Sequence, residues 1–200
     1  MPSGGLERAR AVLDRLTAQG VPNAFGPQRF GRDGTNVAQG LAILRGEAPA
    51  PRNRRIKDLL LSSAQSEAFN RVLERRMAEG RFTRALLGDV MQKHDTHGLF
   101  DVTDPEAEQP RVDRLEISPT AALPGAKVRR PAAGWAAEVE REVSAELGLD
   151  EALLARLDEG TRRALRYPLR GAELGPAPDA PDALVLDLSL PSGAYATVVL

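Results

Sequence analysis

Apolar residues recur at the 3.6-residue spacing of amphipathic helices in the first half of the chain. The stripe is clear in residues 6–19, where charged side chains occupy the opposite face, and in the longer stretch 57–79. A shorter stretch, 37–45, has the same spacing, and Asn36 before it belongs to the residue types that cap helix N-termini. The pattern therefore predicts three helices, of which the longest belongs in the protein core.

The second half of the chain mixes further helices with a strand. Residues 131–147 predict a helix in which the spacing of Trp135 and Val139 favours a core position for the tryptophan over an exposed stacking face. Residues 153–157 predict a short helical piece. The clearest strand is 184–190, where leucine alternates with other residues. The elements together predict an α+β fold.

A small sheet is predicted between these helices. Short apolar runs predict three strands, at 90–93, 99–102 and 115–117. The polar residues 94–98 join the first two. His94 and His97 in that connection come without cysteine or a second pair of ligands, so a polar hairpin tip is favoured over a metal site.

Four stretches are predicted to lack regular structure because they are polar or rich in proline and glycine. Residues 103–114 predict a loose connection, 119–125 a rigid turn and 175–181 a flexible linker. Residues 46–51 disfavour both helix and strand in the same way, and they mark the first domain boundary.

The composition is that of an ordinary globular protein and excludes several classes. The 200 residues include 42% hydrophobic and 28% charged residues, no cysteine, and no apolar run long enough to span a bilayer. The first residues lack the basic flank and apolar core of a secretory signal. We therefore expect a cytoplasmic protein with no membrane partner, no disulfides and no thiolate metal site.

The formal net charge of −1 conceals an uneven distribution. Residues 27–57 hold seven basic residues against two acidic ones, whereas 104–116 and 138–151 are mostly acidic. A second basic group lies at 162–170. A basic stripe on a neutral body is what contact with nucleic-acid phosphates requires, but an ordinary solvated surface explains the arginines equally well.

Residues 20–36 combine glycine, proline, phenylalanine, arginine and asparagine at an unusual density. Glycine lets the main chain approach a ligand closely, and phenyl and guanidinium groups supply stacking faces and phosphate-binding forks. These are the parts of an RNA site, although an ordinary turn with two core phenylalanines explains the residue types as well. If residues 25–30 are extended, Phe25 and Phe30 face opposite ways, so only one ring faces a pocket.

The same stretch carries a specific word. From Gly20 it reads Gly-Val-Pro-Asn-x-Phe-Gly-x-Gln-Arg-Phe-Gly, with Asn36 after it, and it closely resembles the signature of the TruD family of tRNA pseudouridine synthases. Three later stretches match the family in the right order, at 53–70, 119–125 and 190–197. The resemblance therefore covers essentially the whole chain.

The resemblance implies both an architecture and a reaction. It implies a pseudouridine-synthase catalytic domain with a mixed sheet, formed in part by residues 1–48 and 171–200. A mainly helical insertion domain at 49–170 would interrupt it, with RNA in the cleft between the two. The implied enzyme is a monomeric isomerase that converts a specific uridine of tRNA to pseudouridine without cofactor or metal.

The resemblance also implies roles for individual residues. Asn23 would hydrogen-bond the target nucleotide, Phe25 would support its pocket and Tyr195 would stack on the base. Arg29 or a nearby basic group would contact phosphates; that group is Arg52, Arg54, Arg55 and Lys57. The chain departs from the family at Ala24, where tyrosine is common, and at Tyr195, where phenylalanine is usual, which leaves the substrate preference open.

One implied part has no match in the sequence. The family's nucleophile is an aspartate in a Gly-Leu-Lys-Asp type motif well before the word at Gly20, and no such motif occurs in these residues. We therefore expect the later portion of a synthase that is inactive alone. The alternative is a non-catalytic RNA-binding remnant of such an enzyme. A helical protein-interaction domain without an RNA role is a third interpretation.

Overall fold

The computed structural model describes residues 4–157, 159–177 and 180–198, and it has the predicted α+β class. The helices are α1 (Gly4–Gln19), α2 (Pro27–Phe30), α3 (Thr35–Arg45), α4 (Arg54–Ala78), α5 (Pro105–Asp113), α6 (Trp135–Glu146) and α7 (Glu151–Leu154), with 3-10 turns at Arg32–Gly34 and Ala196–Val198. The strands are β1 (Val21–Pro22), β2 (Val90–Lys93), β3 (Leu99–Asp101), β4 (Ile117–Leu123), β5 (Thr161–Ala164), β6 (Arg166–Tyr167), β7 (Arg170–Ala177) and β8 (Ala180–Ser189). None of the described helices is long and apolar enough to cross a membrane.

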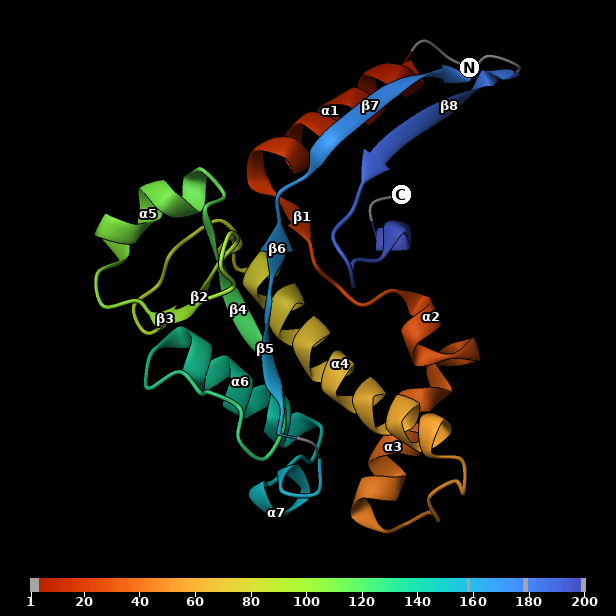
Figure 1. Ribbon diagram of the computed structural model, residues 1–200, viewed down its shortest axis with the longest axis vertical. Coiled ribbons are helices and arrows are strands. Elements are labelled where there is room, and N and C mark those ends of the chain that lie inside the picture. The colour runs from red at the N-terminus through yellow and green to blue at the C-terminus, as the bar shows by residue number, and fades with distance from the viewer. Residues whose placement is uncertain (1–3, 158, 178–179, 199–200) are drawn as a thin grey trace.

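The long helix α4 is the element against which much of the chain packs (Figure 1). Its buried face carries Phe69 and Leu73, which are 0% and 2% exposed, and α6 contributes Val143 to the same core. Helix α3 joins this core through Leu44. The antiparallel sheet, with strand order β3-β2-β4-β5, lies beside α4 and brings Ala121 of β4 into contact with the same cluster.

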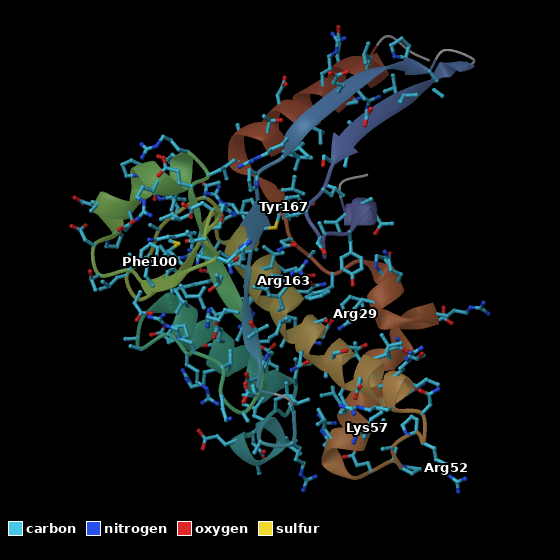
Figure 2. All side chains as sticks on the ribbon, in the orientation of Figure 1. Arg29, Arg52, Lys57, Phe100, Arg163 and Tyr167 are labelled. Carbon is cyan, nitrogen blue, oxygen red and sulfur yellow. The ribbon has the colours of Figure 1, made fainter. Side chains whose placement is uncertain are left out.

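A second packing region lies around α1 and the β7–β8 hairpin at one end of the molecule (Figure 1). Strand β1 pairs with β6 antiparallel, so that Val21 lies opposite Tyr167, which is labelled in Figure 2. Arg166 fixes this junction, because its Nη1 donates to the Gln19 carbonyl at 2.5 Å and its Nη2 to the Val112 carbonyl at 2.6 Å. The residues near position 20 and those near 167 are therefore held side by side.

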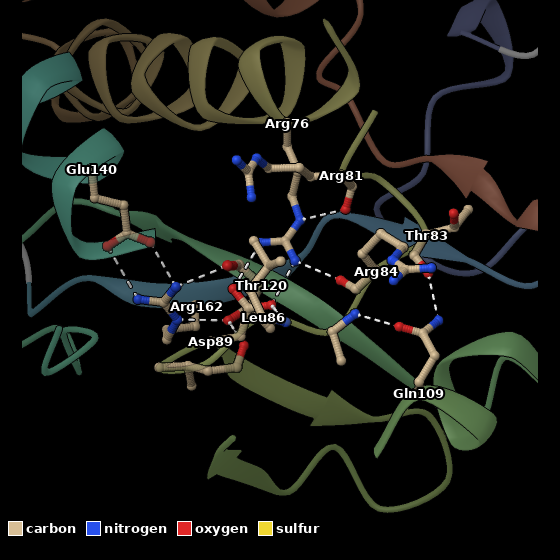
Figure 3. A network of polar contacts seen from close by, with 12 residues as sticks. Arg76, Arg81, Thr83, Arg84, Leu86, Asp89, Gln109, Thr120, Glu140 and Arg162 are labelled. Carbon is tan, nitrogen blue, oxygen red and sulfur yellow. Dashed lines mark hydrogen bonds and ion pairs between the residues drawn. The ribbon is translucent and has the colours of Figure 1, made fainter. Parts of the chain in front are cut away.

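Two buried ion pairs stabilise the region between α4 and the sheet (Figure 3). Arg76 of α4 pairs with Asp89 at 2.5 Å, and both side chains are 1% exposed. Arg162 of β5 pairs with Glu140 of α6 at 2.6 Å and also donates to the Thr120 hydroxyl at 2.6 Å. Because each charge is paired and hydrogen-bonded, these arginines hold the fold together and are not free for a ligand.

The structure confirms several of the predicted elements. Helix α1 ends at Gln19, and Gly20 follows it with a φ of +81°, which suits glycine. Helix α4 starts at Arg54, ahead of the apolar stripe, because the Asn53 side chain accepts a hydrogen bond from the Arg55 amide and caps the helix. The β2–β3 hairpin and α6 lie where the pattern predicts them, whereas α7 shares only residues 153–154 with the predicted piece 153–157. The strand predicted at 115–117 starts at Ile117, as β4.

The condition considered for residues 25–30, an extended backbone, does not hold, because Pro27–Phe30 form α2. Pro27 occupies the first turn of α2, where its missing N–H costs nothing. Asn36 is not the cap of α3; Gly34 occupies that position. The Asn36 side chain instead donates to the Arg29 carbonyl at 3.3 Å and so ties α3 to α2.

Three stretches predicted to be irregular are regular. Residues 103–114 contain α5, because the Asp104 carboxylate accepts from the Glu106 and Ala107 amides. Residues 119–125 lie mostly in β4, a central strand that includes Pro119. Residues 175–181 lie mostly in the β7–β8 hairpin, and positions 178–179 fall outside the described residues.

The predicted division into a catalytic domain and an insertion stays a prediction. Packing crosses its first boundary, since Arg45 at the end of α3 donates to the Leu147 carbonyl at 2.7 Å. Trp135 is only partly buried against the core, and its indole N–H donates to Glu79 at 2.7 Å. The indole therefore packs against the core as predicted while its edge reaches the surface.

Candidate functional site

Segments far apart in the sequence meet around one aromatic ring, that of Phe25. The ring lies 5.6 Å from that of Phe69 on α4 and 5.8 Å from that of Tyr195 near the end of the chain, both in edge-to-face arrangements. The backbone of Phe25 is fixed as well, because its amide donates to the Asn70 side chain at 2.9 Å and its carbonyl accepts from the same side chain at 3.0 Å. Phe25 therefore holds the loop after β1 against α4, and it brings Tyr195 to the same place.

Asn23 lies at the end of β1 and is tied to β5 and its surroundings. Its backbone amide donates to the Leu165 carbonyl at 2.9 Å, and its side-chain amide donates to the Ala164 carbonyl at 2.8 Å. Its side-chain oxygen accepts a hydrogen bond from Arg163. An amide group has two N–H donors and two lone pairs on oxygen, so one donor and one lone pair of Asn23 have no partner among the described residues.

Arg163 of β5 joins two segments from opposite ends of the chain. Its Nε donates to the Asn23 carbonyl at 3.1 Å, and its Nη2 donates to the Gly193 carbonyl at 3.0 Å. Its guanidinium carbon lies 4.3 Å from the centre of the Phe25 ring, a cation–π arrangement. Burial lowers the pKa of Arg163, Tyr195 and Tyr167 act to raise it, and Arg29 has a smaller lowering effect.

Arg29 lies on the other side of this group, on α2 (Figure 2). Its guanidinium carbon is 5.6 Å from the centre of the Phe25 ring, and its Nε donates to the Ser66 hydroxyl at 3.1 Å. The C-terminal turn also reaches α2, because the Thr197 hydroxyl lies 3.2 Å from the Gln28 side-chain oxygen. Asn23, Phe25, Arg29 and Tyr195, all predicted from the sequence, are thus brought together.

The other predicted phosphate contacts form a separate group at the N-terminal end of α4. Arg52, Arg54 and Lys57 line a cavity of about 530 Å³ together with Arg156. Arg55 is exposed but is not among the lining residues. The structure therefore brings three of the four predicted side chains to one cavity and leaves Arg55 on the surface beside it.

Sequence reasoning missed two arginines. Arg163 belonged to the second basic group, but the group is not uniform, because Arg162 and Arg166 are buried and structural. The alternation of β5 distinguishes Arg162 from Arg163, whereas Arg166 lies in β6. Arg156 lies just after α7 and donates to the Leu44 carbonyl at 2.9 Å. No sequence signal separated it from ordinary surface arginines.

Two other features, a second cavity and His94, offer fewer polar groups for a ligand. A larger cavity of about 660 Å³ lies between α6, α7 and β4, but its lining is mainly apolar and includes none of the predicted site residues. His94 donates to or accepts from the Ser118 hydroxyl at 2.8 Å. Within the described ranges, no group of three or more His, Cys, Asp or Glu side chains could hold a metal ion.

Comparisons with known proteins show which family this chain resembles. The family model described as tRNA pseudouridine synthase D (TruD) matches residues 48–200. The chain is 46% identical to tRNA pseudouridine synthase D of Anaeromyxobacter dehalogenans over 98% of its length, and 43% identical to a Thermus thermophilus protein of the same name over all of it. It spans 58% and 54% of the lengths of these two relatives.

A solved structure shares the fold. It comes from Methanosarcina mazei, is described as a candidate tRNA pseudouridine synthase D (TruD), and superposes with a TM-score of 0.75 over 96% of this chain and 64% of its own. The sequence identity is 22%, so this likeness supports the fold alone.

Proposed function

The chain belongs to the TruD family, and we propose on this basis that its protein isomerises a uridine of tRNA to pseudouridine. The single observation that carries the proposal is that Tyr195 packs against the Phe25 ring while Arg163, which lies over the same ring, holds the Asn23 side chain, although Asn23 and Tyr195 are far apart in sequence. If the motif that begins at Gly20 formed only a turn, no contact between Phe25 and the distant Tyr195 would be required.

This cluster is suited to hold a base that has left its stack. Removing a base from its stack costs a few kcal/mol, and stacking on an aromatic ring returns about 1–3 kcal/mol per base. Tyr195 offers such a ring at the margin of the cluster, since it is only partly buried and packs edge-to-face against Phe25. We propose that Tyr195 stacks on the uracil and that the free donor and lone pair of Asn23 recognise its edge.

The basic group at α4 is suited to the tRNA backbone. Arg52, Arg54, Lys57 and Arg156 place four cations around one cavity, with Asp58 as its acidic lining residue. The Arg54–Asp58 contact of 3.7 Å joins exposed side chains, 92% and 60% accessible, so it competes weakly with a phosphate. We propose that this group positions the tRNA while the Phe25 cluster holds the target nucleotide.

Binding of a tRNA transcript at several salt concentrations tests the proposal. The double variant Arg54→Ala with Arg55→Ala removes two cations beside the cavity, and each lost phosphate contact lowers the slope of log K against log salt by about 0.9 for a duplex site. The matched control is Arg84→Ala with Arg114→Ala, two exposed arginines on other elements. A slope that is the same in wild type and both double variants would contradict the proposed role of the group.

Turnover is measured separately, by tritium release from tRNA that carries tritium at C5 of uridine. Pseudouridine formation joins C5 to the ribose and so frees this hydrogen. We expect the 200 residues alone to bind tRNA without tritium release, because the sequence has no match to the nucleophile motif. Release by the purified chain would show a nucleophile that our account has not identified.

A further inference from the structure

Arg29 and Arg163 form a pair of cations that no carboxylate neutralises within the described residues. Both guanidinium carbons lie close to the Phe25 ring, at 5.6 and 4.3 Å from its centre. Neither forms an ion pair with an acidic side chain in the described ranges, whereas the buried Arg76 and Arg162 each have one. The buried Arg76 and Arg162 therefore have an anionic partner, and Arg29 and Arg163 have none among the described residues.

The hydrogen bonds of the pair also leave donors unused. Arg29 uses Nε on the Ser66 hydroxyl, and its two terminal nitrogens have no partner among the described residues. Arg163 uses Nε and Nη2 on Asn23 and Gly193, and its Nη1 has no such partner. A guanidinium presents its N–H groups in a planar fork that matches phosphate and carboxylate oxygens.

A third polar group nearby is unsatisfied. Tyr167 is 5% exposed, and its hydroxyl has no hydrogen-bond partner in the part of the chain described. Burial raises the pKa of Tyr167, and the charge of Arg163 acts in the opposite direction. A buried hydroxyl without a partner costs free energy.

We propose that Arg29 and Arg163 together bind one phosphate group of the RNA, next to the nucleotide whose base rests on Tyr195. The proposal rests on the proposed function and names the part of the RNA that this cluster recognises. In a nucleotide the charged phosphate is separated from the base by one sugar. Tyr195, Arg29 and Arg163 all contact the Phe25 ring, so a base on Tyr195 would have its phosphate close to the arginines. The anion offsets the repulsion between the two cations.

The position of Arg163 gives this contact a second effect. Its fork already holds the Asn23 carbonyl and side-chain oxygen and the Gly193 carbonyl. A phosphate bound to the remaining nitrogen would therefore restrain the Arg163 side chain and, through it, both Asn23 and the segment at Gly193. Arg163 is a positioning residue for Asn23 as well as a phosphate contact.

The test measures binding of a tRNA transcript against salt concentration in four variants. They are Arg29→Gln, Arg163→Gln, the double variant of these two, and Arg163→Lys. The double variant is expected to lower the slope of log K against log salt by about 0.9, the value for one phosphate. Arg163→Lys keeps the charge and is expected to keep the wild-type slope, although it cannot keep the bonds to both Asn23 and Gly193.

The outcomes separate this proposal from the proposed function. If wild type fails to bind tRNA, the proposed function fails. If wild type binds and the double variant keeps the full slope, the phosphate site alone is overturned. A fall of about 1.8 would mean two separate phosphates and would overturn the shared site.

Controls guard against misfolding. Arg29→Gln leaves the hydrogen bonds of Arg163 to Asn23 in place, so it remains informative if Arg163→Gln unfolds. Urea unfolding of each variant shows whether the fold persists. The double control Arg84→Gln with Arg114→Gln is expected to keep the wild-type slope, since both residues are exposed on other elements.

Discussion

At the residue scale, arginine serves two purposes in this protein, and the partner of each side chain decides which. Arg76 and Arg162 are 1% and 5% exposed and pair with carboxylates, so they stabilise the fold. Arg29 and Arg163 both lie over the Phe25 ring and have no carboxylate partner within the described residues. The count of basic residues therefore says little about RNA binding until each guanidinium is assigned its partner.

A single histidine gives the fold a pH dependence. Burial lowers the pKa of His94, and Arg166, His97 and Arg170 lower it further, whereas Asp95 raises it. Because the folded-state pKa lies below the ordinary 6.5, neutral His94 is favoured in the folded protein. Its contribution to the free energy of unfolding is present above pH 6.5 and is lost as the pH falls through the folded-state pKa.

We predict that the loss of stability between about pH 7.5 and about pH 5 is smaller in His94→Gln than in wild type, because the variant has no group to protonate at this place. Urea unfolding at the two pH values measures it. His97→Gln removes an exposed imidazole that also lowers the pKa of His94 and leaves the His94–Ser118 contact in place, so its loss is expected to lie between those of wild type and His94→Gln. An identical loss in wild type and His94→Gln would show that His94 does not carry the effect.

At the element scale, the helices were predictable where periodicity and caps agree, and the other elements were harder to predict. Residues 103–114 have a weak apolar period, and the cap at Asp104 followed by Pro105 was the signal that could have found α5. Pro119 argued for a turn. It is tolerated in β4 because its carbonyl still accepts from the Leu165 amide at 2.9 Å. The β7–β8 hairpin was hidden by the prolines near its tip.

The contact between α3 and α4 depends on a glycine. A Cβ at Gly40 would lie 2.2 Å from the Leu60 carbonyl oxygen of α4, which is backbone and cannot move aside. We predict that Gly40→Ala lowers the free energy of unfolding by about 1–3 kcal/mol, the range for overpacking, despite the better helix propensity of alanine. Urea unfolding measures this.

The matched control for Gly40 is Gly175→Ala. Gly175 lies in β7, and an added Cβ meets nothing within 4 Å. We expect it to change the free energy of unfolding by less than about 1 kcal/mol. If Gly40→Ala is as stable as Gly175→Ala, the helices do not pack as closely as the structure has them.

At the scale of the whole molecule, the candidate site forms because segments from the start and the end of the chain pack against β5 and α4. The resemblance to a family placed Asn23 and Tyr195 in one pocket. In the structure Tyr195 contacts the Phe25 ring, and Arg163 lies over that ring and donates to Asn23 and to the Gly193 carbonyl. Spacing alone could not do so, because the link passes through β5, whose register against β4 sets the direction of Arg163. That register depends on contacts between distant residues, which local patterns do not encode.

Photocrosslinking tests the central claim most directly. A tRNA transcript containing 4-thiouridine is bound to the chain, irradiated and digested with trypsin, which cuts after Arg15, Arg29 and Arg170. The account predicts that one uridine position attaches both to the peptide 16–29, which holds Asn23 and Phe25, and to the peptide 171–200, which holds Tyr195. Attachment confined to peptides of α5, α6 or the β2–β3 hairpin would contradict it.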